Sequence, residues 1–195
     1  MLSSRNKGFI WEIYNSGDKV FTLPTVALLS GETNFQLLNQ KLNYYVRTGK
    51  LLRPRKGIYA KPGYNPEELA CMLYTPSYLS LEYVLQKAGV VFQYDSRITA
   101  ISYLSRSVEV DNYTVYYRKI KNEILINMRG INRNGNINIA TPERAFLDTL
   151  YLNGSYYFDN IHSLNEQMVR ELLPIYNSKI LIQRVNKILQ KGGHQ

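Results

Sequence analysis

The chain has 195 residues, 45% of them hydrophobic, and a formal net charge of +9 at pH 7. This hydrophobic content is enough for a buried core and excludes a disordered chain. One cysteine and two histidines exclude a disulfide framework and a four-ligand zinc site. No apolar run approaches the roughly 18 residues of a membrane span, and the first residues lack a signal-peptide core. We therefore expect a cytoplasmic protein with no membrane partner, no metal and no cofactor.

The positive charge is concentrated in the first third of the chain. Residues 1–62 contain ten Lys and Arg against three acids, a net charge of +7, whereas residues 63–195 carry a net charge of only +2. Lys and Arg gain affinity for nucleic acid by displacing counterions from phosphates. The distribution predicts a nucleic-acid-binding domain at residues 1–62 and a second domain at residues 63–195. A solvated basic surface is the alternative.

The basic segment has the local pattern of a helix-turn-helix. Apolar residues at helical spacing predict a first helix over about residues 3–15. Thr22 is the predicted N-cap of a short second helix over Pro24–Leu29. A glycine-containing turn at residues 30–32 leads into a longer third helix that ends at about Thr48.

The third helix has two distinct faces at about 100° per residue. One face gathers the apolar side chains expected to pack on the core, namely Phe35, Leu38, Leu42, Tyr45 and Val46. The opposite face gathers polar side chains, namely Gln36, Gln40, Asn43 and Arg47. Asn and Gln can form two hydrogen bonds with adenine, and Arg with guanine, so the polar face is predicted to read base edges. A merely solvated helix face is the alternative.

Two further features complete the predicted interface. Thr33 or Asn34 caps the third helix, and Leu37 and Tyr44 flank its polar face, either as the margin of the core or as apolar contacts to thymine methyl groups and sugars. The turn sequence Arg-Pro-Arg-Lys-Gly within residues 51–60 then predicts a β-hairpin with three cations at its tip, a wing that lies on the DNA backbone. A plain solvent-exposed hairpin is the alternative. The predicted DNA-binding residues are Thr33, Asn34, Gln36, Gln40, Asn43, Tyr44, Arg47, Arg53, Arg55 and Lys56.

After a linker at residues 61–66, helical and strand patterns are mixed. Predicted helices begin at Glu67, at Ser80 as an N-cap and at Thr141, and two more cover about residues 165–176 and 178–190. Predicted strands cover Arg97–Ser105, Tyr113–Ile120, Glu123–Met128 and Ile137–Ala140, with turns at Asp111-Asn112 and at residues 133–136. The fold class is therefore α+β: an N-terminal winged helix-turn-helix followed by a mixed α/β domain with a mainly antiparallel sheet.

The second domain lacks recognisable catalytic motifs. It has no glycine-rich phosphate loop, no Gly-x-Ser-x-Gly elbow and no carboxylate cluster with metal-ligand spacing. Arg144 and Asp148, four residues apart on a predicted helix, are interpreted as a surface or helix-bridging ion pair. Cys71 is interpreted as a small core residue. We therefore expect no enzymatic activity.

Three stretches together resemble the AbiEi-type antitoxins of type IV, abortive-infection toxin–antitoxin systems. They are Leu52–Tyr59 (LRPRKGIY), Pro76–Leu85 (PSYLSLEYVL) continuing to Gly89, and Ile139–Asp148 (IATPERAFLD). The resemblance implies a winged helix that binds the operator of the antitoxin's own operon and represses it. It also implies a C-terminal domain that counteracts a co-encoded nucleotidyltransferase toxin. In this family the antitoxin acts without a stable complex with the toxin, so direct contact is not implied.

The sequence is thus interpreted as a DNA-binding transcriptional repressor with an attached antitoxin-like domain. Two alternatives remain open at this point. One is a stand-alone regulator whose C-terminal domain senses a ligand or dimerises. The other is a nucleic-acid-processing enzyme that uses the winged helix for docking.

Overall fold

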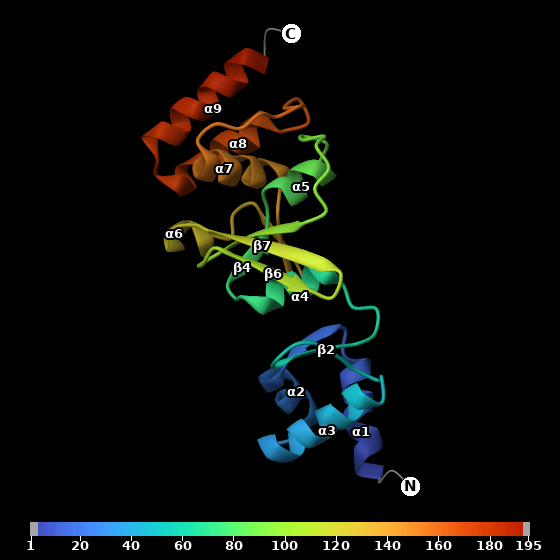
Figure 1. Cartoon of the computed structure of the whole chain (residues 1–195). Helices are drawn as coiled ribbons and strands as arrows, with labels where there is room; N and C mark the ends of the chain where they lie inside the picture. Colours follow the sequence, from blue (N-terminus) through green and yellow to red (C-terminus); the bar gives the residue numbers. More distant parts are fainter. Residues whose placement is uncertain (1–3, 193–195) are drawn as a thin grey trace. The chain divides into compact units, whose positions relative to one another are not determined.

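The structure is a computed structural model that describes residues 4–192 (Figure 1). Its contacts divide the chain into two compact units, Met1–Leu73 (unit 1) and Tyr74–Gln195 (unit 2). Each unit has its own hydrophobic core. The two units are therefore described one after the other.

Unit 1 consists of helices and a small antiparallel sheet. Its elements are α1 (Ser4–Asn15), β1 (Val20–Thr22), α2 (Leu23–Ser30), α3 (Phe35–Arg47), β2 (Leu52–Arg55), β3 (Ile58–Ala60) and α4 (Pro66–Leu73). The sheet order is β1-β3-β2, with β3 antiparallel to both neighbours. The three predicted helices and the hairpin are confirmed, except that the predicted start of the first helix at residue 3 lies outside the described residues.

The core of unit 1 follows the helical spacing of its apolar residues. Its buried members are Phe9, Ile13, Phe21, Val26, Leu38, Leu42, Tyr45, Leu51 and Tyr59. Thr22 caps α2 as predicted, because its hydroxyl oxygen accepts a hydrogen bond from the Thr25 N–H at 3.3 Å. Gly31 ends that helix at a φ of 64°, a left-handed conformation that favours glycine. These local signals explain why the sequence pattern located the helices.

Helix α4 is the last element of unit 1, and a buried carboxylate on it bonds to the start of β1. Glu68 is 7% exposed, and its carboxylate accepts hydrogen bonds from the backbone N–H groups of Lys19 at 3.1 Å and Val20 at 3.0 Å, where β1 begins. The predicted boundary at residue 62 lies before this helix, whereas unit 1 ends after it. Cys71 on the same helix is buried, as predicted.

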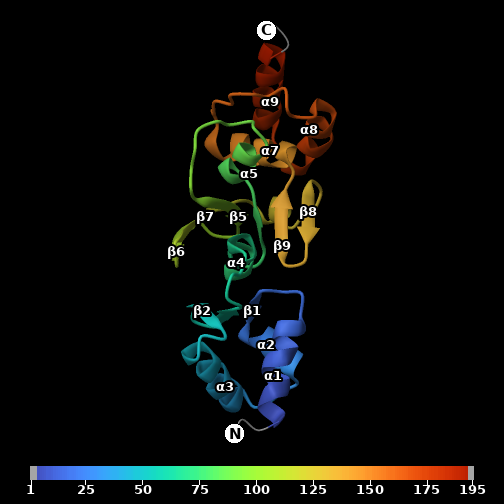
Figure 2. The same cartoon turned by 90° about the vertical axis from the view of Figure 1, so that its right-hand side faces the viewer.

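Unit 2 is a six-stranded mixed sheet covered by helices. Its strands are β4 (Ser77–Leu79), β5 (Ile98–Ser102), β6 (Arg106–Val110), β7 (Tyr113–Lys119), β8 (Ile131–Asn134) and β9 (Ile137–Ala140), in the order β6-β7-β5-β4-β9-β8. Its helices are α5 (Glu82–Lys87), α6 (Asn122–Leu125), α7 (Pro142–Asn153), α8 (Glu166–Leu172), the 3-10 helix η1 (Leu173–Tyr176) and α9 (Lys179–Gly192). Figures 1 and 2 show α5, α7, α8 and α9 on one side of the sheet, where the core lies.

The sheet confirms a mixed α/β fold and corrects several details. Three of its five pairings are antiparallel, and β5–β7 and β4–β9 are parallel. The strand predicted at Glu123–Met128 is wrong: this segment contains the short helix α6, which turns Ile124 and Leu125 together into the core. Strands β4, β6 and β8 were not predicted.

Candidate nucleic-acid interface

Helix α3 presents its predicted polar face to solvent. Gln36, Gln40, Asn43 and Arg47 are all exposed, and Leu38, Leu42 and Tyr45 on the other side are buried. Phe35 departs from the prediction, since its side chain is 52% exposed instead of packed in the core. It is the first residue of the helix, so no preceding turn covers it. An amide-rich surface is therefore held in place by an apolar seam.

The start of α3 is fixed by side chains from the preceding turn. The side-chain oxygen Oδ1 of Asn34 accepts hydrogen bonds from the N–H groups of Gln36 at 3.0 Å and Leu37 at 3.1 Å. Asn34 is thus the N-cap, and Thr33 beside it is exposed. The amide of Asn34 serves the helix, so it supports the predicted interface by positioning α3.

An ion pair ties the turn to the body of the helix. The Lys41 ammonium lies 2.9 Å from Glu32, whose other carboxylate oxygen accepts the Asn34 N–H at 3.1 Å. The Lys41 and Glu32 side chains are only 19% and 17% exposed. The one cation within the first two turns of α3 is therefore engaged inside unit 1.

The flank of the polar face is aromatic and slightly hollowed. The Arg47 guanidinium lies 6.0 Å from the centre of the Tyr44 ring, and Tyr44 is half-buried against Tyr45. A hollow of about 200 Å³ lies beside them, lined by Leu37, Gln40, Lys41, Tyr44 and Tyr45. Tyr44 therefore contributes both to the margin of the core and to the surface next to the polar face.

The turn of the hairpin is shorter than predicted. Its turn is Lys56-Gly57, with Gly57 at a φ of 81°, so Arg53 and Arg55 lie in strand β2 and only Lys56 stands at the tip. Arg53 is exposed and lies 5.7 Å from the centre of the Tyr59 ring, whereas Arg55 is half-buried. The prediction of three cations at the tip is wrong, because the two-residue turn leaves no room for them.

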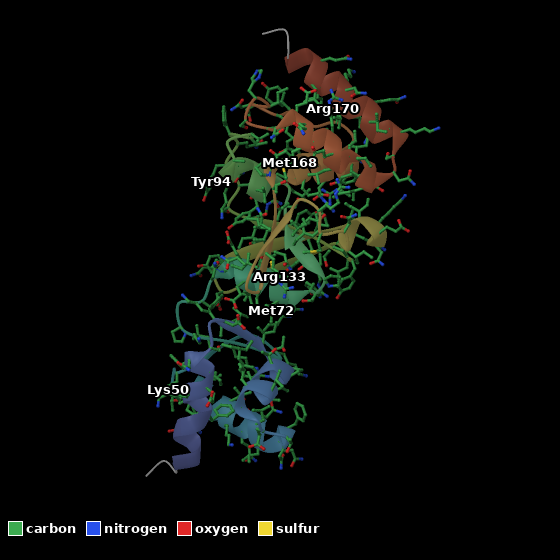
Figure 3. The ribbon with its side chains drawn as sticks, turned by 180° about the vertical axis from the view of Figure 1, so that it is seen from behind. Lys50, Met72, Tyr94, Arg133, Met168 and Arg170 are labelled. Carbon is green, nitrogen blue, oxygen red and sulfur yellow. The ribbon has the colours of Figure 1, made fainter. Side chains whose placement is uncertain are left out.

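The segment that contains α3 and the hairpin is uniformly basic. Residues 33–66 contain no Asp or Glu and seven cations: Lys41, Arg47, Lys50, Arg53, Arg55, Lys56 and Lys61. Lys50, labelled in Figure 3, follows α3 and lies 5.9 Å from the centre of the Tyr45 ring. Lys61 donates instead to the Ser16 carbonyl at 2.7 Å. Burial lowers the pKa of Lys61, and nearby Asp18 and Glu68 oppose that effect.

Unit 2 contains a different polar cluster, which is fully buried. The Arg144 guanidinium and the Asp148 carboxylate lie 3.5 Å apart on α7, and both side chains are 0% exposed. Asp148 accepts hydrogen bonds from the hydroxyls of Tyr176 at 2.7 Å, Ser80 at 2.8 Å and Tyr78 at 3.2 Å. Of the two interpretations given above, the surface pair is wrong, because both side chains are fully buried; the pair bridges α7 to η1 through the Tyr176 hydroxyl.

The same cluster joins α7 to β4, to residues 124–129 and to η1. Arg144 donates to the carbonyl of Ile124 at 2.8 Å and to that of Arg129 at 2.9 Å, and it lies between the rings of Tyr78 and Tyr176. Burial raises the pKa of both tyrosines well above the usual value, with Asp148 adding to the effect, so their hydroxyls remain donors. Burial also raises the pKa of Asp148, and Arg144 opposes that shift. This arrangement holds elements together.

The sequence analysis missed the partners of this pair. Ser80 was assigned as an N-cap, but α5 begins at Glu82, and the Ser80 hydroxyl donates to Asp148 instead. Tyr78 and Ser80 lie in one of the resembling stretches, and Arg144 and Asp148 lie in another. The two stretches therefore contact one another through this cluster. Helical or strand periodicity describes neighbouring residues only, so it gives no sign of a contact between distant stretches.

Within residues 4–192, no group of three or more His, Cys, Asp or Glu side chains is placed to hold a metal ion. In the same part of the chain, every helix is too short or too polar to cross a membrane.

Comparison with known proteins rests on the fold. No protein-family model matches the chain, and a search of curated proteins gave no match. Among solved structures, the crystal structure of the RV2827C protein from Mycobacterium tuberculosis is similar, with a TM-score of 0.58 and 14% sequence identity. The match covers 99% of this chain and 78% of that chain. At this identity the likeness shows the mixed α/β fold alone, and it extends over both units.

Proposed function

We propose that unit 1 is a winged helix-turn-helix that binds double-stranded DNA, and that the chain represses the operon that encodes it. The carrying observation is the exposed face of α3, on which Gln36, Gln40, Asn43 and Arg47 project from a helix whose other side is buried. Such amides are the donors and acceptors that read base edges in the major groove. The element order and the antiparallel sheet β1-β3-β2 also support a winged helix.

The charge distribution supports the same proposal. The wing is the hairpin β2–β3, whose exposed cations Arg53 and Lys56 would contact phosphates while α3 enters the groove. Arg47 and Lys50 at the end of α3 would add phosphate contacts. About four to six counterions would be released, which corresponds to a slope of log affinity against log salt of roughly −4 to −5.

For unit 2 we propose the antitoxin role that the resemblance implies. The two resembling stretches of this unit meet in the buried cluster around Arg144 and Asp148. That contact supports a structural role for both stretches, because their polar side chains bond to one another inside the unit. The unit would counteract a co-encoded nucleotidyltransferase toxin, without a stable complex being required.

The DNA-binding proposal is tested by comparing helix and wing variants. Binding to the duplex upstream of the chain's own reading frame and to random duplexes is titrated at several salt concentrations. Gln40→Ala should cost about 1–3 kcal/mol on the specific duplex and little on random DNA. Lys56→Ala should weaken both duplexes similarly and flatten the salt slope by about one unit. A wild-type salt slope near zero would refute the proposal.

The antitoxin proposal is tested in cells. The full chain and an Arg53→Ala, Lys56→Ala variant are each expressed from an unrelated promoter beside the co-encoded toxin. If unit 2 provides protection, both proteins rescue growth, because repression of the native operon plays no part. Rescue that disappears in this variant would show that protection depends on DNA binding and would remove the separate role for unit 2.

A further inference from the structure

The first two turns of α3 carry a surface of restricted chemistry. In helix-turn-helix proteins the N-terminal residues of the recognition helix contact base edges. Here those exposed residues are Phe35, Gln36, Leu37 and Gln40, so the surface is made of amides and apolar groups. Asn39 donates from its amide to the Phe35 carbonyl at 2.9 Å and is thereby engaged by the helix itself.

The cation nearest this surface is held by a carboxylate. Lys41 is paired with Glu32 at 2.9 Å and is largely covered. Arg47 lies eleven residues beyond Gln36, which is about 16 Å along the helix axis at 1.5 Å per residue. Recognition of guanine in the major groove most commonly uses Arg or Lys. The part of α3 that would lie deepest in the groove thus lacks an available guanine-reading cation.

Leu37 is an exposed apolar side chain beside Gln40. Leu37 is 41% exposed and lines the hollow of about 200 Å³ together with Gln40, Lys41, Tyr44 and Tyr45. Gln40 can form two hydrogen bonds with adenine, while thymine presents a methyl group in the same groove. An amide beside an exposed leucine therefore matches an A·T step.

We propose that α3 selects A·T base pairs, with Gln36 and Gln40 bonding adenine and Leu37 receiving a thymine methyl group. This inference rests on the proposed DNA-binding function and specifies its ligand class, a duplex whose central contacted steps are A·T. Leu37 is then a specificity-determining residue. Arg47 contacts the backbone or the margin of the site.

The test separates base preference from DNA binding. The full chain selects duplexes from a pool with 20 random base pairs, and the enriched duplexes are sequenced. Each thymine of the best duplex is then replaced by deoxyuridine, which removes only the methyl group. We expect an A·T core in which replacement at one or two positions weakens binding about fourfold each, the value for burying one methylene-sized group.

Variants of the protein test whether Leu37 is the residue that contacts the thymine methyl group. Leu37→Ala should bind the thymine and deoxyuridine duplexes equally, because the apolar contact is absent. Leu28→Ala, which truncates an exposed leucine on α2, should retain the fourfold difference. Gln40→Ala should weaken the A·T duplex about tenfold or more.

The outcomes distinguish three failures. A G·C core would overturn A·T selection while DNA binding stands. A deoxyuridine duplex that binds as well as the thymine duplex, or a Leu37→Ala variant that keeps the difference, would overturn the contact between Leu37 and the thymine methyl group. Failure of the full chain to bind any duplex of the pool would overturn both the inference and the proposed function beneath it.

Discussion

The two units place their most distinctive polar residues in opposite environments. On α3 of unit 1, Gln36, Gln40 and Asn43 project into solvent from a helix with a buried apolar seam. On α7 of unit 2, Arg144 and Asp148 are completely buried and bonded to neighbouring elements. The same type of element therefore uses polar residues for a surface in one unit and for internal connection in the other.

Whether a polar residue on a helix is buried or exposed decides what its side chain contributes. Buried charges are retained only where they are paired and hydrogen-bonded, so those of α7 determine how that helix is held. Exposed amides contribute little to folding, so those of α3 are available to bind a ligand. The units should therefore respond in opposite ways to truncation of their polar residues.

The largest expected effect concerns the buried cluster. Arg144→Leu should lower the free energy of unfolding of unit 2 by about 3–5 kcal/mol, because the buried Asp148 carboxylate loses its cation. The matched control is Arg170→Leu: Arg170, labelled in Figure 3, forms an exposed pair with Glu166 at the same four-residue spacing. That variant should cost about 0–1 kcal/mol. Urea unfolding followed by circular dichroism measures both.

A double variant shows whether the cost comes from an unpaired charge. Arg144→Leu combined with Asp148→Leu removes both charges, so it should be more stable than Arg144→Leu alone. If the double variant is less stable by the sum of the two single effects, the pair does not act as a unit. In that case pairing of the buried charges would not explain what they contribute to stability, and α7 would not differ from α3 in this respect.

The next effect concerns the attachment of α4 to unit 1. Glu68→Ala should lower the free energy of unfolding by about 1.5–3 kcal/mol, because the backbone N–H groups of Lys19 and Val20 lose a charged acceptor. Glu12→Ala, which truncates an exposed acid on α1, is the control and should stay within about 0.5 kcal/mol of the wild type. Urea unfolding of both variants measures the two changes in the free energy of unfolding.

The contact between Glu68 and the start of β1 predicts which of two N-terminal fragments is more stable. A fragment of residues 1–73 keeps Glu68, whereas a fragment of residues 1–62 ends before it. We expect the longer fragment to be more stable and to bind the upstream duplex more tightly. Equal stability of the two fragments, measured by thermal unfolding, would contradict the assignment of α4 to unit 1.

Much of unit 1 could be predicted because its signals are local. The cap at Thr22, the glycine at position 31 and the spacing of Leu38, Leu42 and Tyr45 all act within a few residues. The exposure of Phe35 was not predicted, since helical periodicity gives a direction around the axis and does not show where the core ends. The short turn Lys56-Gly57 was likewise hidden within a longer run of turn-forming residues.

Much of unit 2 was harder because its determinants are distant in sequence. Ser80 and Asp148 are 68 residues apart, so the cap-like pattern at Ser80 carried no sign of its actual partner. The apolar run of α6 resembled a strand because a four-residue helix is too short to show its period. Of the candidate site, the exposed face of α3 was predictable, whereas the engagement of Lys41 by Glu32 required the structure.

The smallest expected effects compare the same substitution in the two units. Thr22 caps α2 and Thr141 caps α7, each with its hydroxyl accepting a backbone N–H at 3.3 Å. Thr22→Ala and Thr141→Ala should each cost about 1 kcal/mol, and the corresponding Ser variants, which keep the hydroxyl, should cost less. Because contacts cluster into two units, Thr22→Ala should reduce amide hydrogen-exchange protection only within residues 4–73 and Thr141→Ala only within residues 74–192. Loss of protection that spreads through both units in either variant would show that they unfold together, and the contrast between their polar residues would then belong to one cooperative structure.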